Sequence, residues 1–190
     1  MNQHSNRINP PWRRPRRVLR SSFPEEIWSW LLDPTSLTRR LRKACDGRFE
    51  VQLLSQHWAR PSREEARVLG MRTGACANVR EVYLLCREQP CVFARTVIPA
   101  RTLRGKYRRL TRLGNKSLGA VLFADKSMRR SSLEIAHLMP GQRLFERALR
   151  DLLARPPLIW GRRSLFHLAG NPLLLSEIFL HDMHQCQCTK

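Results

Sequence analysis

Three charged side chains stand among apolar residues in segments that alternate like β-strands. Glu177 lies in "NPLLLSEIFL" on a face with three large apolar side chains, and Arg80 in "NVREVYLLC" and Arg95 in "CVFARTVIP" stand in similar positions. A guanidinium group offers parallel donors to a carboxylate of a protein or of a ligand. Two interpretations stay open: the charges pair in structural salt bridges, Arg80 with Glu177 among them, or they face one shared polar pocket that binds a ligand.

Other catalytic and metal-binding patterns are weak or absent. His181, His184, Cys186 and Cys188 have side chains that ligate zinc, but their spacing matches no closed structural site. The sequence also lacks a phosphate-binding glycine loop, a dinucleotide fingerprint and a nucleophile elbow. We therefore expect no metal and no cofactor.

The charge of the chain favours anionic partners. Its 190 residues include 35 Lys and Arg against 15 Asp and Glu, a formal net charge of +20. Nucleic acid, a membrane surface and a small polyanion all suit such an excess. No nucleic-acid-reading module is recognisable, so we expect no specific nucleic acid partner and a largely solvated basic surface.

The chain is long enough for one domain with its own core. We expect a flexible basic tail over residues 1–22, a folded domain over 23–181 and a short tail over 182–190. No apolar stretch has the length of a membrane span, and no secretory signal is present, so we expect a monomeric cytoplasmic protein. The six cysteines are then expected to be reduced thiols.

The elements that would position the charged residues follow from periodicity and turn residues. Short helices are predicted over 24–34 and 35–45, a basic helix over 104–114 and an amphipathic helix over 141–157. Residues 58–73 are predicted to form a loop. Strands are predicted over 47–56, 78–86, 91–99, 127–138, 159–170 and 171–180. This order indicates an α+β fold with a single, mostly antiparallel sheet backed by helices.

Several segments together resemble bacterial chorismate lyase of the ubiquinone pathway. They are "WLLDPTSLTRRL", "REVYLLC", "ARTVIP", "LGNKSLGAVLF" and "WGRRSLFHLAGNPLLLSEIFL", of which "WGRRS" followed by "PLLL-x-E-x-FL" is the most specific. The resemblance covers roughly residues 28–180. It implies a single antiparallel sheet with an internal ligand site under helical flaps. It also implies conversion of chorismate to 4-hydroxybenzoate and pyruvate without metal or organic cofactor. An enclosed site makes product release a candidate slow step.

The resemblance also implies site residues. Arg80 matches the arginine that grips the ring carboxylate, and Glu177 matches the acid at the hydroxyl end; these two are the candidate catalytic residues. Leu37 and Leu118 match positions that contact the ligand mainly through backbone atoms, and Arg95 is expected to be a neighbour of the site. We hypothesise that burial keeps Glu177 protonated, so that it donates a proton to the departing ether oxygen.

Two departures from the family pattern bear on ligand binding. Ala94 stands where relatives carry glycine, which places a methyl group where it can crowd the ligand. The segment 141–157 and the basic N-terminal tail look like additions to the compact family members.

Two other classes of function remain as alternatives. The fold implied by the resemblance is similar to the effector-sensing domain of some transcription regulators, so the chain can also be a non-catalytic sensor of aromatic acids. Such regulators carry a winged-helix domain ahead of the sensor, and the N-terminal tail is too short for one. A nucleic-acid-binding protein would explain the charge alone.

Overall fold

The computed structural model describes residues 9–180, and one six-stranded sheet organises this part of the chain. The sheet order is β1-β2-β3-β6-β5-β4, and every neighbouring pair is antiparallel. The fold class predicted from the sequence is therefore confirmed. The strands are β1 (Phe49–Ala59), β2 (Ala77–Cys86), β3 (Gln89–Pro99), β4 (Arg129–Leu138), β5 (Ile159–Leu168) and β6 (Asn171–Phe179).

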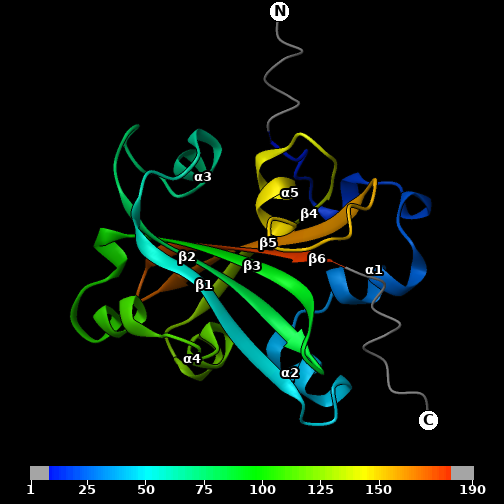
Figure 1. Cartoon of the computed structure of the whole chain (residues 1–190). Coiled ribbons are helices and arrows are strands. Elements are labelled where there is room, and N and C mark those ends of the chain that lie inside the picture. The colour runs from blue at the N-terminus through cyan, green and yellow to red at the C-terminus, as the bar shows by residue number, and fades with distance from the viewer. Residues whose placement is uncertain (1–8, 181–190) are drawn as a thin grey trace, which may run out of the picture.

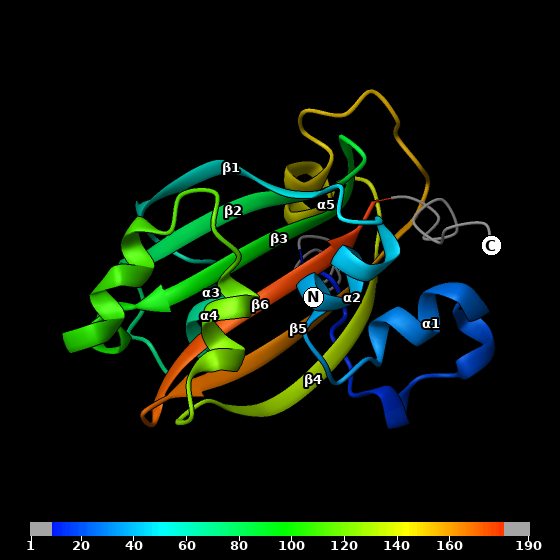
Figure 2. The ribbon, with the colours of Figure 1, turned by 90° about the horizontal axis from the view of Figure 1, so that it is seen from below.

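Short helices cover both faces of the sheet. Figure 1 shows α3 (Arg63–Val68) and α5 (Arg143–Ala148) on one side and α2 (Leu37–Ala44) and α4 (Leu118–Ala124) on the other. Figure 2, seen from below, shows α2 and α4 lying across the strands, with α1 (Glu25–Leu31) beside them. The basic segment Gly105–Arg112 is a 3-10 helix, whereas the sequence predicted a helix over 104–114.

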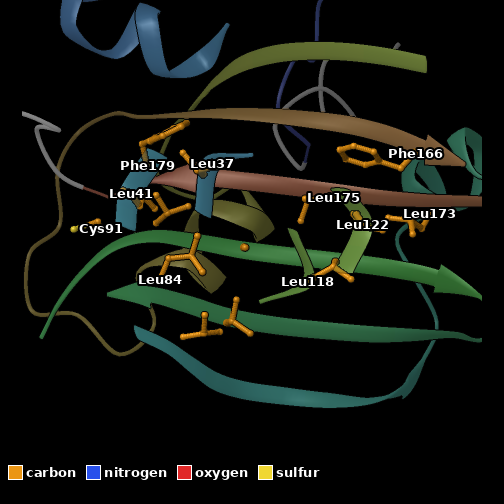
Figure 3. Close-up of a cluster of buried hydrophobic side chains, with 14 of the residues drawn as sticks. Leu37, Leu41, Leu84, Cys91, Leu118, Leu122, Phe166, Leu173, Leu175 and Phe179 are labelled. Atoms are coloured by element: carbon orange, nitrogen blue, oxygen red, sulfur yellow. The ribbon is translucent and has the colours of Figure 1, made fainter. Parts of the chain in front are cut away.

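The sheet is a middle layer because both of its faces are buried. All but one of the residues of β2 are buried, so the central strands read as near-continuous apolar runs in which each charge is conspicuous. On the α2 and α4 side, leucines of the two helices point toward the sheet (Figure 3). On the other side, Tyr83 and Phe93 pack against α5, and the Tyr83 hydroxyl donates to the carbonyl of Ala148 at 3.0 Å.

Serine caps start the helices that cover the sheet. Ser36 Oγ accepts the backbone N–H of Arg39 at the start of α2, and Ser117 Oγ accepts that of Ala120 at the start of α4. Each cap satisfies one of the N–H groups that a helix leaves unpaired in its first turn. The helix predicted over 35–45 with Thr35 or Ser36 as its cap is thus confirmed, with Ser36 in that role.

Two segments differ from their predictions. The predicted loop over 58–73 contains the end of β1 and helix α3, which begins with a capping box between Ser62 and Glu65. The helix predicted over 141–157 is confined to α5, which ends at Ala148, and Leu153 is fully exposed. The apolar side chains at the start of that segment pack against the sheet, and the chain then leads into β5.

The second half of the segment predicted as a flexible tail, residues 1–22, contacts the folded domain. The backbone of Arg13 exchanges hydrogen bonds with Ile135 of β4, at 3.0 and 2.8 Å, and the ring of Trp12 lies against the guanidinium group of Arg163. Prolines and arginines without apolar periodicity gave no sign of this docking, because the partners are edge-strand backbone groups and a cation. Residues 1–8 lie outside the described part of the chain.

The expectation of reduced thiols is wrong for two of the six cysteines. Cys45, at the C-terminal end of α2, and Cys86, at the end of β2, form a disulfide across 5.4 Å between their Cα atoms. The pairing follows from α2 lying on the sheet, which brings residues 41 positions apart together. The bond ties the far end of a helix that covers the sheet to a central strand.

The packing of the sheet explains the glycine in "WGRRS". A Cβ atom added at Gly161 would lie 2.6 Å from Ile178 Cδ1 and 3.1 Å from Leu138 Cδ1. We predict that Gly161→Ala lowers the free energy of unfolding by about 1–3 kcal/mol through overpacking, as measured by denaturant titration. Removing the clashing methyl group in Gly161→Ala/Ile178→Val should recover part of the loss, so the two single costs should not add. Additive costs, or no cost for Gly161→Ala, would contradict this packing account.

Candidate active site

Two rows of side chains cross the sheet beneath α2 and α4. Pairing between strands places Val82, Ala94, Glu177 and Arg162 in one row. The neighbouring row contains Arg80, Thr96, Leu175 and Ser164. Together with the helices, the side chains of these rows other than Ser164 line a pocket.

The N-terminal ends of α2 and α4 form the roof of this pocket. The Ser117 hydroxyl donates to Thr38 Oγ1 at 3.0 Å, and a Cβ atom at Gly119 would lie 3.2 Å from that oxygen. The two helices therefore touch directly over the sheet. Leu37 and Leu118, the first residues of the helices, both line the pocket, and backbone N–H groups of a first helical turn have no partner within the helix.

Arg80 carries a charge that no acid compensates. Its side chain is 2 % exposed, and its Nη2 donates to the carbonyls of Gly114 and Lys116, both at 2.9 Å. Its Nε is buried without a hydrogen-bond partner, and no ion pair to it occurs within residues 9–180. Burial lowers the pKa of Arg80 to about 10, below its ordinary value. Such a group favours an anion that enters the pocket.

Glu177 pairs with a different arginine. Arg162 Nε donates to Glu177 Oε2 at 2.6 Å, and Arg162 Nη1 donates to the carbonyls of Trp30 and Asp33 at 2.8 and 2.9 Å. The alternative of an Arg80–Glu177 salt bridge is thereby excluded. The hypothesis of a protonated Glu177 stays a prediction, and the partner of that carboxyl group in the structure is Arg162.

Arg130 is the third guanidinium group of the pocket. Its Nε and Nη2 donate to Ser164 Oγ at 3.0 and 2.7 Å, and its Nη1 donates to the carbonyls of Pro34 and Asp33. Burial, and next the charge of Arg162, lower the pKa of Arg130 below its ordinary value. With Arg80, Arg162 and Glu177, the pocket holds three cations and one anion, an excess of two positive charges.

The sequence singled out neither Arg162 nor Arg130. Alternation along "WGRRS" would have placed Arg162 on the face of Ser164, but nothing in the segment distinguished it from Arg163. Arg130 lies beside an irregularity, since the pairing of β4 with β5 shifts register between Arg130 and Ser132. A simple two-residue alternation fails at such a bulge.

Arg95 does not line this pocket, which corrects the expectation of one site shared by all three charges. It lies on the opposite face of the sheet, where Nε donates to Glu65 Oε1 at 2.8 Å and Nη1 donates to Glu81 Oε1 at 2.6 Å. Its neighbours across the sheet are Glu81 and Ser176, whereas Ala94 beside it faces the pocket. Arg95 therefore belongs to a buried ion-pair network.

Comparison with known proteins places this arrangement in a family. Residues 8–187 match the family model for chorismate lyase. The chain belongs to the chorismate lyase family. Proteins named probable chorismate pyruvate-lyase are similar to it: that of Methylococcus capsulatus is 45% identical over 152 residues, covering 80% of this chain and 93% of the relative. That of Nitrosomonas eutropha is 42% identical over 164 residues, covering 86% and 92%.

Solved structures show the same fold at low identity. The effector domain of PhnF from Mycobacterium smegmatis superimposes with a TM-score of 0.55 at 18% identity, over 80% of this chain and 91% of that domain. A structure titled PhnF C-terminal domain gives a TM-score of 0.56 at 17% identity, over 70% and 82%. The fold of this chain is thus shared with the effector domain of PhnF.

Two further predictions concern metals and membranes. The candidate zinc ligands His181, His184, Cys186 and Cys188 lie outside the described residues. Between residues 9 and 180, no cluster of three or more His, Cys, Asp or Glu side chains is arranged to hold a metal ion. No helix in that range has the length and hydropathy of a membrane span.

Arg80 and Arg162, two buried arginines in neighbouring rows, should respond oppositely to substitution. Arg80→Met removes an uncompensated buried charge, so we predict a free energy of unfolding that is unchanged or higher. Arg162→Met leaves Glu177 buried without its partner and should lower the free energy of unfolding by about 3–5 kcal/mol. Denaturant titration of both variants measures the difference. Equal destabilisation would show that Arg80 is not held at a cost.

Proposed function

We propose that this protein is a chorismate lyase that eliminates pyruvate from chorismate and releases 4-hydroxybenzoate for ubiquinone biosynthesis. The excess of two positive charges in the roofed pocket is the observation that carries the proposal. Chorismate is a dianion with two carboxylates, so its charge complements that of Arg80, Arg130, Arg162 and Glu177. Membership of the chorismate lyase family supports the same substrate.

The geometry suits one ring with a carboxylate at one end and a hydroxyl at the other. Arg80 on β2 and Glu177 on β6 are separated by β3, roughly 10 Å at the usual spacing between strands. In the proposed complex Arg80 binds the ring carboxylate, with backbone N–H groups of Leu37 and Leu118 closing around it. The ring then lies over Ala94, whose methyl group forms part of the floor.

The reaction needs positioning more than it needs a reagent. The ether C–O bond between ring and enolpyruvyl group breaks with its electron pair leaving on oxygen, the ring loses one hydrogen, and the released pyruvate carries that hydrogen. The atoms balance without an oxidant or reductant, so we propose cofactor-independent catalysis. In this scheme Arg162 holds the Glu177 carboxyl group in place, and that group accepts a hydrogen bond from the ring hydroxyl. The roof of α2 and α4 holds the reactive conformer and excludes water.

Incubation of the purified protein with chorismate tests the proposal. We expect 4-hydroxybenzoate, followed by its absorbance, and an equal amount of pyruvate, followed with lactate dehydrogenase. Arg80→Met, which is expected to fold, should lose both products. Tight binding of 4-hydroxybenzoate without turnover would instead identify a sensor of aromatic acids. An absence of both binding and turnover would contradict the site itself.

Glu177 should matter for turnover beyond its role in folding. We predict that Glu177→Gln lowers kcat by about 10²-fold or more, because a neutral amide no longer matches the ring hydroxyl and Arg162 together. Steady-state kinetics well below the melting temperature of the variant measure this. Ser176→Ala, at the next position of β6 on the other face, is the matched control and should keep its activity. Full turnover by Glu177→Gln would reduce Glu177 to a structural partner of Arg162.

A further inference from the structure

The proposed contacts account for one carboxylate of the substrate and leave Arg130 without a role. Arg130 lies on β4, at the opposite side of the pocket from Arg80 on β2. Chorismate carries a second carboxylate, on the enolpyruvyl group that leaves. The question is whether the structure provides a separate group for it.

The hydrogen-bond partners of the Arg130 side chain within residues 9–180 are uncharged groups. Four contacts, from Nε, Nη1 twice and Nη2 once, use the Ser164 hydroxyl and the carbonyls of Asp33 and Pro34. A guanidinium group has five N–H donors, so one on Nη2 remains for a ligand. The partners fix the position of the group without neutralising its charge.

Arg130 and Arg162 lie against each other. The carbonyl of Asp33 accepts from Nη1 of both, at 3.3 Å from Arg130 and 2.9 Å from Arg162. The acids near the two charges are both engaged with other arginines or with Arg162 itself: Glu177 pairs with Arg162 at 2.6 Å, and the Asp33 carboxylate pairs with Arg40 at 3.1 Å. Two like charges on one carbonyl, Arg162 buried and Arg130 half-buried, are unfavourable, and a second anion would offset this repulsion.

We propose that Arg130 binds the enolpyruvyl carboxylate of chorismate and so distinguishes the dianionic substrate from the monoanionic ring product. This inference rests on the proposed function and adds a residue that determines specificity. After elimination the second carboxylate departs with pyruvate, and the ring product keeps only the contacts at the end of Arg80 and Glu177. Arg130 therefore contributes to binding the substrate and contributes nothing to holding 4-hydroxybenzoate.

A purely structural role makes a different prediction. Arg130 fixes the carbonyls of Asp33 and Pro34, which precede α2 in the roof of the pocket. If that were its whole role, its removal would loosen the roof over every ligand. Affinity for substrate and for product would then fall together.

The experiment compares substrate and product in the same variants. For Arg130→Met we expect kcat/KM for chorismate to fall about 10- to 100-fold, the loss of one charge-assisted hydrogen bond. The Kd for 4-hydroxybenzoate, by isothermal titration calorimetry, should change less than about twofold, since a merely loosened roof would weaken it. Arg130→Lys keeps the charge and should recover part of the loss. Arg129→Met is the matched control, because Arg129 is exposed and bonds only to the carbonyls of Lys126 and Met128, and it should leave both values unchanged.

Two outcomes would overturn the proposal: equal losses for substrate and product in Arg130→Met, or no loss for either. A wild-type protein that makes no 4-hydroxybenzoate overturns the proposed function instead. In that case, calorimetric binding of intact chorismate to the wild type and to Arg130→Met still decides whether Arg130 holds the second carboxylate.

Discussion

The pocket beneath α2 and α4 carries positive charge that the surrounding protein does not neutralise, and the sheet and helices must hold that charge in place. Arg80 and Arg130 are held in place by backbone carbonyls and a hydroxyl, and neither has an acidic partner in the described part of the chain. Such contacts fix a guanidinium group without cancelling its charge, so the free protein bears a desolvation cost that an anionic ligand relieves. The surrounding sheet and helices must supply enough apolar burial to support this cost.

The sheet separates two clusters of polar side chains, one on each of its faces. Successive residues of a strand serve opposite sides: Arg80 and Glu177 face the pocket, whereas their neighbours Glu81 and Ser176 face the other side. On that other side Arg95 lies between Glu65 and Glu81, so its charge is neutralised locally. The same residue type is therefore structural on one face and available to a ligand on the other, and the difference lies in the nearby carboxylates.

The roof formed by α2 and α4 encloses the pocket. Helices α2 and α4 are short, begin with serine caps and meet through the hydroxyls of Ser117 and Thr38. Their leucines join the main core beneath them, as Figure 3 shows. At its far end α2 is tied to β2 by the Cys45–Cys86 disulfide. Enclosure of the pocket thus depends on two caps, one buried hydroxyl pair and the packing of a few leucines.

The sequence alone predicted the fold and most of the strands. Of the five site residues that it proposed, four line the pocket: Leu37, Arg80, Leu118 and Glu177. Charges on apolar strand faces and family motifs are local signals, so they are legible in one chain. The register in which strands pair cannot be read from one chain, and it is this register that places Arg95 on the other face of the sheet. Arg130 was missed because it lies beside a β-bulge, and Arg162 was missed because Arg163, the next residue, is also an arginine. The disulfide and the docking of residues 9–22 depend on tertiary contacts that no local pattern encodes.

Two ligands of similar shape, one anionic and one neutral, would show whether the positive charge of the pocket selects the ligand. Calorimetry would compare 4-hydroxybenzoate with 4-hydroxybenzamide, a neutral molecule of nearly the same shape. If an uncompensated Arg80 selects the ligand, the amide should bind about 100-fold more weakly or worse, as expected when charge-assisted hydrogen bonds are lost. Equal affinity for the two would contradict the account, since the positive charge of the pocket would then have no part in recognition.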